Sequence, residues 1–508
     1  MRPRSFHMVA LVMGLLSPAA FAAAPASQIP PSTAATKAAT HALKTYSGDI
    51  VASVAKMVSY NTVAVPNVPI AANPAHIGFK QYLREHGEHL GFDVTDYGSV
   101  VVVGMGKGPQ RVGIVTHGDV QPVNPAKWAK SPFELDTTSE PGRLIGRGTE
   151  DDKGPIATAL YAMKAIKDQG IVLSKRIELY VYMAEESDWD PLVAHLKEHA
   201  PPQMNITLDS EYPVVTAEKG FGSVSFMLPN QPARIDSVEP DLIAFTGGFF
   251  GSQIPEDAGA VIANATPRLE AQIRQRAAAQ KGMRYQFLWQ DKQLAITALG
   301  VSAHSSQPEN GVNAISMLAD ALAVRPWADS TAGALVNFLN EVIGTGVYGQ
   351  KFGNVAYRDD FMGPMTVAPT VIKQSPEGIS LNINIRRPKG KSKDQVVAEM
   401  SAALTQWQAR HVALTNIKLN IGDPWVQANA PQVDTLLSVF SHYTGIKNAK
   451  PRSIGGGTNS RLFPNAVSFG PAMPDATYSG HSEHEFITLK QLLLNLQMYT
   501  AVLVELAK

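Results

Sequence analysis

Three short apolar runs, over residues 112–116, 177–183 and 206–208, constrain this chain most, because each leads directly into acidic residues or histidine. Their length and composition predict β-strands. The residues that follow them are His117-Gly118-Asp119, Ala184-Glu185-Glu186 and Asp209. In a parallel sheet the carboxyl ends of the strands meet at one edge, where ligands bind. The sequence therefore predicts that these polar side chains gather in one site.

A helix predicted over residues 152–169 separates the first two of these strands. Pro155 lies near its start and Gly170 follows its end, which is the usual asymmetry of helix termini. Strands that alternate with helices predict an α/β fold, here a mixed, mostly parallel sheet flanked by helices. The α/β pattern returns near the C-terminus, where a helix is predicted over residues 489–506.

The middle of the chain follows a different pattern. Residues 222–229, 294–299 and 378–386 alternate as antiparallel strands do, and Thr266 is a suitable N-cap for a helix over residues 267–280. We therefore expect an α+β lid domain inserted into the α/β domain. The predicted boundaries are 45–222 and 425–508 for the two parts of the α/β domain and 223–424 for the inserted lid.

The first 22 residues have the features of an export signal. Arg2 and Arg4 precede a short apolar stretch over residues 8–16, and Ala20-Phe21-Ala22 fits a cleavage site. An uncleaved anchor is the alternative. We predict a signal peptide over residues 1–22 and a periplasmic or secreted protein. Residues 23–44, rich in Ala, Pro, Ser and Thr, are predicted to form a flexible tether.

Composition excludes several classes of protein. The chain has 44 basic and 44 acidic residues, and this balance argues against a nucleic-acid partner, which needs a basic patch. It has no cysteine, which excludes disulfides, thiolate zinc sites, iron–sulfur clusters and cysteine nucleophiles. After the signal no stretch is long and apolar enough to span a membrane, so no membrane association is expected. Any metal site must use His, Asp and Glu.

Two further polar clusters lie outside the strands, at residues 146–154 before the predicted helix and at residues 481–485 near the C-terminus. Imidazole and carboxylate groups are suitable ligands for zinc and related ions. Several carboxylates in one site would repel each other unless a cation neutralises them. Two divalent ions sharing a carboxylate would achieve this, and they would also activate water and polarise a carbonyl group. One carboxylate should then stay free to act as a general base.

Five segments together match a known pattern, namely residues 116–120, 146–155, 185–189, 209–213 and 455–458, the last followed by His481 and Glu485. Their sequence resembles the co-catalytic zinc metallopeptidase family that contains aminoacylase, carnosinase and glutamate carboxypeptidase. The Glu185-Glu186-Ser187-Asp188-Trp189 segment is especially similar to that of the bacterial Xaa or β-Ala dipeptidases in this family. The resemblance covers nearly all of the mature chain and implies that the α/β domain is catalytic.

The resemblance also implies a role for each matching residue. Asp151 would bridge two divalent ions, most simply zinc, although manganese and cobalt accept the same ligands. His117 and Asp209 would complete one metal site. Glu186 and His481 would complete the other. The remaining implied roles are Glu185 as general base, Asp119 as the residue that orients the His117 ring, and a cis peptide between Asp151 and Asp152.

The lid would contribute as well. Residues 300–306 resemble the family's lid motif, which implies that His304 stabilises the oxyanion. Residues 385–388 resemble a segment whose first arginine, here Arg386, clamps the substrate carboxylate. Gly456 and Thr458 could offer backbone donors to the same carboxylate. The lid is large, like that of the bacterial dipeptidases in which one chain supplies a complete site, so we expect a monomer.

Three positions depart from the family pattern and concern substrate choice. His484 replaces the usual Asn before the terminal Glu, Asn459 stands where an aromatic residue is common, and Ser252 stands where dipeptidases tend to have Asn. His484 could be an additional ligand or a structural residue.

The leading hypothesis for function is an exported, metal-dependent dipeptidase, a metallopeptidase that acts on small peptides. An N-acyl-amino-acid amidohydrolase or a carboxypeptidase with the same dinuclear site is the alternative. A periplasmic solute-binding protein is a more remote one.

Overall fold

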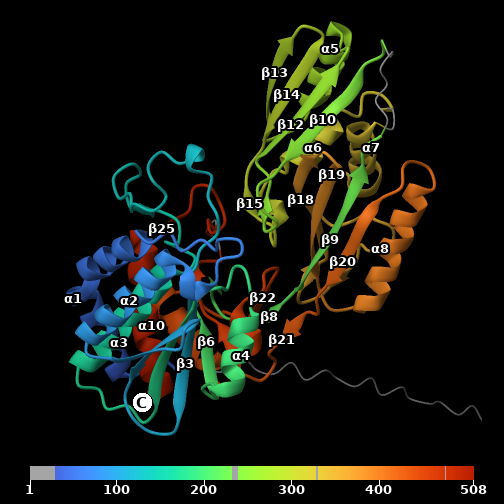
Figure 1. Ribbon diagram of the computed structural model, residues 1–508. Coiled ribbons are helices and arrows are strands. Elements are labelled where there is room, and N and C mark those ends of the chain that lie inside the picture. The colour runs from blue at the N-terminus through green and yellow to red at the C-terminus, as the bar shows by residue number, and fades with distance from the viewer. Residues whose placement is uncertain (1–28, 232–237, 328–329, 475, 477) are drawn as a thin grey trace, which may run out of the picture.

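The computed structural model describes residues 29–231, 238–327, 330–474, 476 and 478–508. The predicted signal peptide over residues 1–22 lies outside them. The chain forms two lobes, each built on one large sheet, and the second lobe is inserted between the two parts of the first (Figure 1). No helix within these described ranges is long and apolar enough to cross a membrane.

The first lobe contains a nine-stranded mixed sheet, as the sequence predicts. Strand β3 runs parallel to both of its neighbours, and β1 and β2 join antiparallel at one edge. The carboxyl ends of the central parallel strands therefore share one edge of the sheet. In spatial order the strands are β1 (Asp93–Asp96), β2 (Val100–Met105), β5 (Arg176–Tyr182), β3 (Arg111–His117), β6 (Met204–Thr207), β23 (Ala466–Ser468), β8 (Val215–Glu218) and β21 (Trp425–Val426), with β22 (Arg452–Ile454) beside β8.

Helices cover both faces of this sheet, because successive residues of a buried strand point to opposite sides. Val101 and Val103 of β2 belong to the larger core, whereas Val100 and Val102 belong to a smaller core that includes Leu192 of α4 (Asp190–Glu198). The helices that pack on the larger core are α1 (Thr33–Val58), α2 (Pro74–His89), α3 (Lys153–Asp168), α9 (Val433–Thr444) and α10 (Leu489–Ala507).

The predicted flexible tether over residues 23–44 is wrong from Thr33 onward, because helix α1 begins there. Ser32 caps the helix by accepting a hydrogen bond from the backbone N–H of Ala35. Four alanines at helical spacing form a fully buried stripe, which lets α1 pack closely on α10 and α3: Ala35, Ala38, Ala39 and Ala42. The alanine content of this segment was therefore misinterpreted as a sign of flexibility, whereas it forms the packing face of a helix.

The lid contains an eight-stranded sheet whose pairings are all antiparallel. It begins with β9 (Gly220–Pro229) and ends with β20 (Thr415–Ile421), so the chain enters and leaves the lid on adjacent strands. The other strands are β13 (Arg284–Gln290), β14 (Gln293–Leu299), β12 (Asp257–Ala263), β10 (Asp241–Gly247), β18 (Thr366–Ser375) and β19 (Gly378–Arg387). The core of the lid includes residues of α5 (Pro267–Ala277), α6 (Ala314–Ala321), α7 (Thr331–Phe338) and α8 (Lys393–Gln408).

Short two-stranded ribbons lie within each lobe. β15 (Ala303–His304) pairs with β11 (Gln253–Ile254) in the part of the lid that faces the first lobe (Figure 1). The side-chain amide of Gln253 donates to the backbone carbonyl of His481 across the two lobes, at 3.1 Å. The other ribbons pair β4 (Arg143–Ile145) with β25 (Phe486–Thr488), β7 (Ser210–Glu211) with β24 (Pro471–Ala472), and β16 (Arg358–Asp359) with β17 (Gly363–Pro364).

Candidate metal centre and active site

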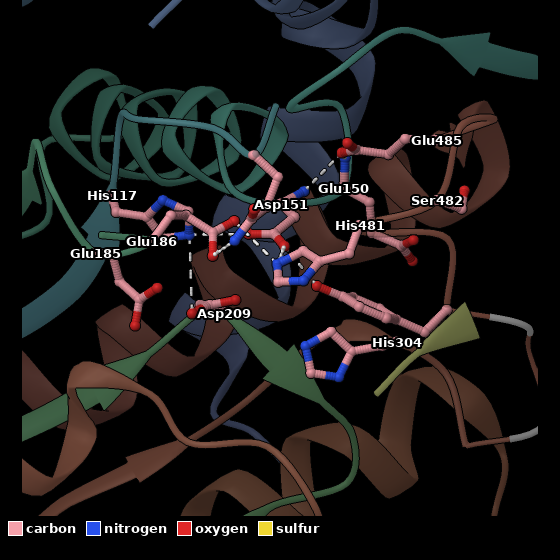
Figure 2. A network of polar contacts seen from close by, with 12 residues as sticks. His117, Glu150, Asp151, Glu185, Glu186, Asp209, His304, His481, Ser482 and Glu485 are labelled. Carbon is pink, nitrogen blue, oxygen red and sulfur yellow. Dashed lines mark hydrogen bonds and ion pairs between the residues drawn. The ribbon is translucent and has the colours of Figure 1, made fainter. Parts of the chain in front are cut away.

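The structure brings the predicted polar clusters together at the carboxyl edge of the first sheet (Figure 2). His117 is the last residue of β3, Glu185 and Glu186 follow β5, and Asp209 follows β6. Asp151 lies just before α3, and His481 lies in the loop before β25. Five of these side chains form two overlapping groups that could each hold a metal ion, and the two groups share Asp151: His117, Asp151 and Asp209, and Asp151, Glu186 and His481.

Asp151 lies between the two histidines and faces each with a different oxygen. Its Oδ1 is 2.9 Å from Nε2 of His117, and its Oδ2 is 3.1 Å from Nε2 of His481. The imidazoles thus lie on opposite sides of one carboxylate, which is the arrangement that a bridging ligand requires. All three side chains are buried, with His117 1% and Asp151 5% exposed.

Each group contains one more carboxylate. Oδ2 of Asp209 lies 3.8 Å from Nε2 of His117, and Oε1 of Glu186 lies 2.9 Å from Nε2 of His481. Imidazole nitrogen and carboxylate oxygen within these distances suit tetrahedral or five-coordinate divalent ions. The donor set therefore fits two divalent cations, as the sequence predicts.

The electrostatics of the site also point to bound cations. Burial raises the pKa of Asp209 well above its ordinary value, and the charge of Asp151 adds to this effect. Burial alone would lower the pKa of His481, but the Glu186 and Asp151 carboxylates outweigh it and raise this pKa to about 10. Such a concentration of buried negative charge is stabilised when metal ions neutralise it.

Asp119 holds the loop that carries two of these acidic residues. Its Oδ1 accepts the backbone N–H of Glu185 at 3.0 Å, and its Oδ2 accepts that of Glu186 at 3.1 Å. The resemblance implied that Asp119 orients the His117 ring. The nearest Asp119 atom to Nδ1 of His117 is the backbone carbonyl oxygen, at 3.0 Å, and the carboxylate is 3.5 Å away. Asp119 therefore orients three residues of the site at once.

The contacts of three supporting side chains were not predicted, although Arg147 and Glu485 belong to the segments that match the family pattern. Oε1 of Glu485 accepts the backbone N–H groups of Glu150 and Asp151, at 2.9 and 3.1 Å. Its Oε2 accepts Nη1 of Arg147 at 2.8 Å, and both side chains are fully buried. The hydroxyl of Tyr478 donates to Oδ2 of Asp151 at 2.8 Å. These contacts hold the backbone and the carboxylate of Asp151 in place. The Asp151–Asp152 peptide is cis, as expected.

Glu185 lies beside the metal centre but belongs to neither ligand group. Burial raises the pKa of its carboxyl group to about 8; the charge of His117 opposes this rise, and the charge of Glu186 adds to it. The side-chain amide of Asn459 donates to Oε1 of Glu185 at 2.8 Å. A carboxylate next to two metal sites, and not used as a ligand, has the position that a general base requires.

His304 reaches the metal centre from the lid of the same chain. Its ring lies 4.5 Å from the His481 ring, centroid to centroid. Burial, with the nearby His481 and Arg386 charges, lowers the pKa of His304 well below its ordinary value, so the ring is neutral. The backbone N–H of Ser306 donates to Nδ1 of His304 at 3.1 Å. Nδ1 is thus an acceptor, and the ring proton belongs on Nε2.

The residues predicted to bind the substrate carboxylate are placed differently. Arg386 is buried and donates to Asn384 and Ser305, at 3.0 and 3.1 Å. It is not among the residues that line a cavity beside the metal centre, which is described below. Gly456 and Thr458 do line that cavity. However, the N–H and the hydroxyl of Thr458 both donate to Oε1 of Glu218, at 3.1 and 2.7 Å. The predicted backbone donor at Thr458 is therefore already used within the protein.

The remaining departures from the family pattern also have defined contacts. Nε2 of His484 lies 2.7 Å from Oε1 of Glu140, and the His484 side chain is 53% exposed and belongs to neither metal group. The backbone carbonyl of Ser252 accepts the N–H of Ser305, which joins it to the segment that carries His304. Asn459 contacts Glu185, as described above.

A cavity of about 640 Å³ opens beside the metal centre. Its wall includes Asp151, Glu185, His304 and His481, so both lobes contribute. Among the described lining residues, Lys219 and Arg452 are basic, and Glu211 and Glu309 are additional acidic ones. The volume and the polar lining suit a small, charged ligand.

A two-lobed α/β fold with this site defines a hydrolytic peptidase. The sequence matches the model of peptidase family M20/M25/M40 over residues 113–505, and the chain belongs to this family.

A β-Ala-Xaa dipeptidase of Lactobacillus delbrueckii subsp. lactis is 31% identical over 424 residues, which cover 82% of this chain and 87% of that protein. Human carnosine dipeptidase 1 has a similar fold, with a TM-score of 0.55 at 15% identity, covering 94% of this chain and 99% of that one. The dipeptidase Dug1p of Saccharomyces cerevisiae gives a TM-score of 0.55 at 13% identity, with coverage of 93% and 98%. The resemblance to the dipeptidase branch is confirmed.

The shared position of Asp151 predicts an unequal loss of metal in two variants. Replacing Asp209 with Ala should leave about one tightly bound zinc per chain, because only one group loses a ligand. Replacing Asp151 with Ala should reduce binding below one zinc, because both groups lose the same ligand. Zinc content after dialysis, measured by mass spectrometry against wild type with about two zinc ions, checks this. Equal zinc content in both variants would contradict a bridging role for Asp151.

Proposed function

We propose that the protein is an exported, metal-dependent dipeptidase that hydrolyses dipeptides or short peptides. The observation that carries this proposal is the Asp151-centred pair of ligand groups, with Glu185 beside them in a cavity lined by both lobes. The β-Ala-Xaa dipeptidase relative supports the choice of substrate class. Export is supported only by the signal-like pattern of residues 1–22.

The ligand groups would hold two divalent cations, zinc first, with manganese or cobalt as alternatives, and no nucleic-acid or membrane partner is proposed. When bound, such ions polarise a carbonyl group and lower the pKa of water. His117, Asp151 and Asp209 would hold one ion. Glu186 and His481, together with Asp151, would hold the other.

Glu185 is the residue proposed to move the proton. Its carboxylate would take a proton from the attacking water and pass it to the leaving amine. Nε2 of His304 would donate a hydrogen bond to the oxyanion that develops on the scissile carbonyl, which the acceptor role of its Nδ1 supports. Both residues line the same cavity, as this division of roles requires.

The position of Glu211 favours a peptide with a free amino group as the substrate, rather than an N-acylated amino acid. Glu211 lines the cavity. Its carboxylate forms only a long ion pair within the described residues, with Oε2 3.7 Å from Nη1 of Arg452. A carboxylate in this place attracts a protonated amine, which an acyl group does not provide. Lys219 adds positive charge to the same cavity, which would attract the carboxylate of a peptide, whereas Arg452 lies beside Glu211. The role of Arg386 as a clamp for the substrate carboxylate remains a prediction, and Arg386 is not among the residues that line the cavity.

The general base can be tested by replacing Glu185 with Ala. We expect kcat to fall by about 10³-fold, because proton transfer loses its acceptor, while zinc content stays at the wild-type level. Steady-state kinetics on a dipeptide, together with zinc analysis, measures both. The control is Glu198→Ala in α4, which removes an exposed glutamate away from the cavity and should leave kcat unchanged. Retained turnover in Glu185→Ala would refute this mechanism.

The substrate class can be tested with a dipeptide and its N-acetylated analogue. The metal-free protein would be reconstituted separately with zinc, manganese or cobalt before each assay. We expect kcat/KM to be at least about tenfold higher for the free dipeptide, because acetylation removes the charge that Glu211 would attract. Faster hydrolysis of the acetylated compound would identify an N-acyl amidohydrolase instead. Binding of both without hydrolysis of either would favour a solute-binding protein.

We further propose that a single chain provides the complete site, so that the enzyme acts as a monomer. The short distance between the His304 and His481 rings of one chain supports this. Mixing Glu185→Ala protein with His304→Ala protein should then restore no activity, because neither chain contains a complete site. Activity assays of the mixture after joint unfolding and refolding check this. Substantial recovery in the mixture would show that lids serve a partner's site.

A further inference from the structure

Asn459 contacts the carboxylate of Glu185 from outside the metal centre. Its side-chain nitrogen donates to Oε1 of Glu185 at 2.8 Å. The residue is only 3% exposed and follows the glycine-rich segment Gly455-Gly456-Gly457-Thr458. Asn459 departs from the family pattern, so its contact with Glu185 cannot be transferred from that pattern.

The buried carboxylate of Glu218 and the half-buried Arg461 fix the place of Asn459. It is the first residue of η5 (Asn459–Leu462), and the preceding Thr458 donates its N–H and its hydroxyl to Oε1 of Glu218. Oε2 of Glu218 accepts Nε and Nη2 of Arg461, at 3.1 and 2.9 Å. Glu218 is fully buried at the end of β8. The turn that presents Asn459 is therefore anchored by charge-assisted hydrogen bonds on both sides.

The rest of Glu185 is held by its backbone. Its N–H donates to Oδ1 of Asp119 at 3.0 Å, and its carbonyl accepts the indole N–H of Trp189 at 2.7 Å. Neither contact sets the direction of the carboxylate at the end of the side chain. In the described part of the chain, the hydrogen bond recorded to that carboxylate comes from Asn459.

Asn459 is not an obvious contributor to stability. Its own side-chain oxygen is buried and has no hydrogen-bond partner among the described residues. A buried, unpaired polar atom destabilises the folded state. The nitrogen of the same amide donates to Glu185, so the contact with Glu185 is the interaction that this side chain makes in the site.

We propose that Asn459 is a positioning residue for the general base. By holding Oε1 of Glu185, it leaves Oε2 directed to the reacting water, so that the base does not rotate away from the proton it must take. This inference rests on the proposed function of Glu185. It assigns to Thr458, Glu218 and Arg461 the task of holding Asn459, in place of the substrate contact that the sequence suggested for Thr458.

The test compares Asn459→Ala and Asn459→Asp with the zinc-loaded wild-type enzyme. We expect kcat to fall by about 10- to 100-fold in both, because each variant loses the donor to Glu185. KM should change by less than about twofold and zinc content should not change, since neither the ligands nor the cavity wall is altered. Aspartate matches asparagine in shape, so it keeps the packing, but it replaces the donor with a carboxylate that repels Glu185. Alanine removes the donor without adding a charge.

The matched control is Asn205→Ala. Asn205 is also fully buried, and its amide donates to the backbone carbonyls of Pro202 and Pro464, at 2.8 and 2.7 Å, near the start of β6. This variant should lower the Tm while its kcat stays within about twofold of wild type, because the site keeps its geometry.

The kinetics use whichever substrate the wild-type enzyme hydrolyses, the dipeptide or its N-acetylated analogue. Wild-type kcat in either Asn459 variant would overturn the positioning role while the proposed function stands. A loss confined to KM would overturn it as well. A wild-type enzyme that hydrolyses neither substrate would overturn the proposed function, and the role of Asn459 with it.

Discussion

The shared carboxylate of Asp151 is the interaction on which the rest of the site depends. One oxygen faces His117 and the other faces His481, so two histidines far apart in the sequence are joined through one side chain. Glu485 holds the backbone of Asp151, and Tyr478 holds its Oδ2. Because several carboxylates are buried around it, this arrangement favours bound cations.

The fold supplies this geometry in a simple way. Parallel strands β3, β5 and β6 end at one edge of the sheet, and the residues directly after them become neighbours there. The lid then closes the site from the other side with His304, while Gly455 lets the lobes approach. A β-carbon at Gly455 would lie 2.2 Å from the backbone oxygen of Ser306, so that contact requires glycine. Catalytic and lid residues thus meet within one chain.

Much of this could be predicted from the sequence, because strand ends and family motifs are local patterns. The ligands His117, Asp151, Glu186, Asp209 and His481 come together as predicted. The supporting contacts, such as those between Glu485 and Arg147 or between Asn459 and Glu185, could not be predicted, because they depend on side-chain directions that no motif in the sequence specifies. Helix α1 was missed for a different reason. Its alanines form a tight packing face only when α10 is present.

The central claim is that two divalent ions occupy the two groups that share Asp151. Anomalous diffraction from crystals of the zinc-loaded protein, recorded on both sides of the zinc absorption edge, tests it most directly. The account predicts two anomalous peaks, one between His117 and Asp209 and one between Glu186 and His481, with Asp151 in contact with both. A single peak, or two peaks of which only one contacts Asp151, would contradict it.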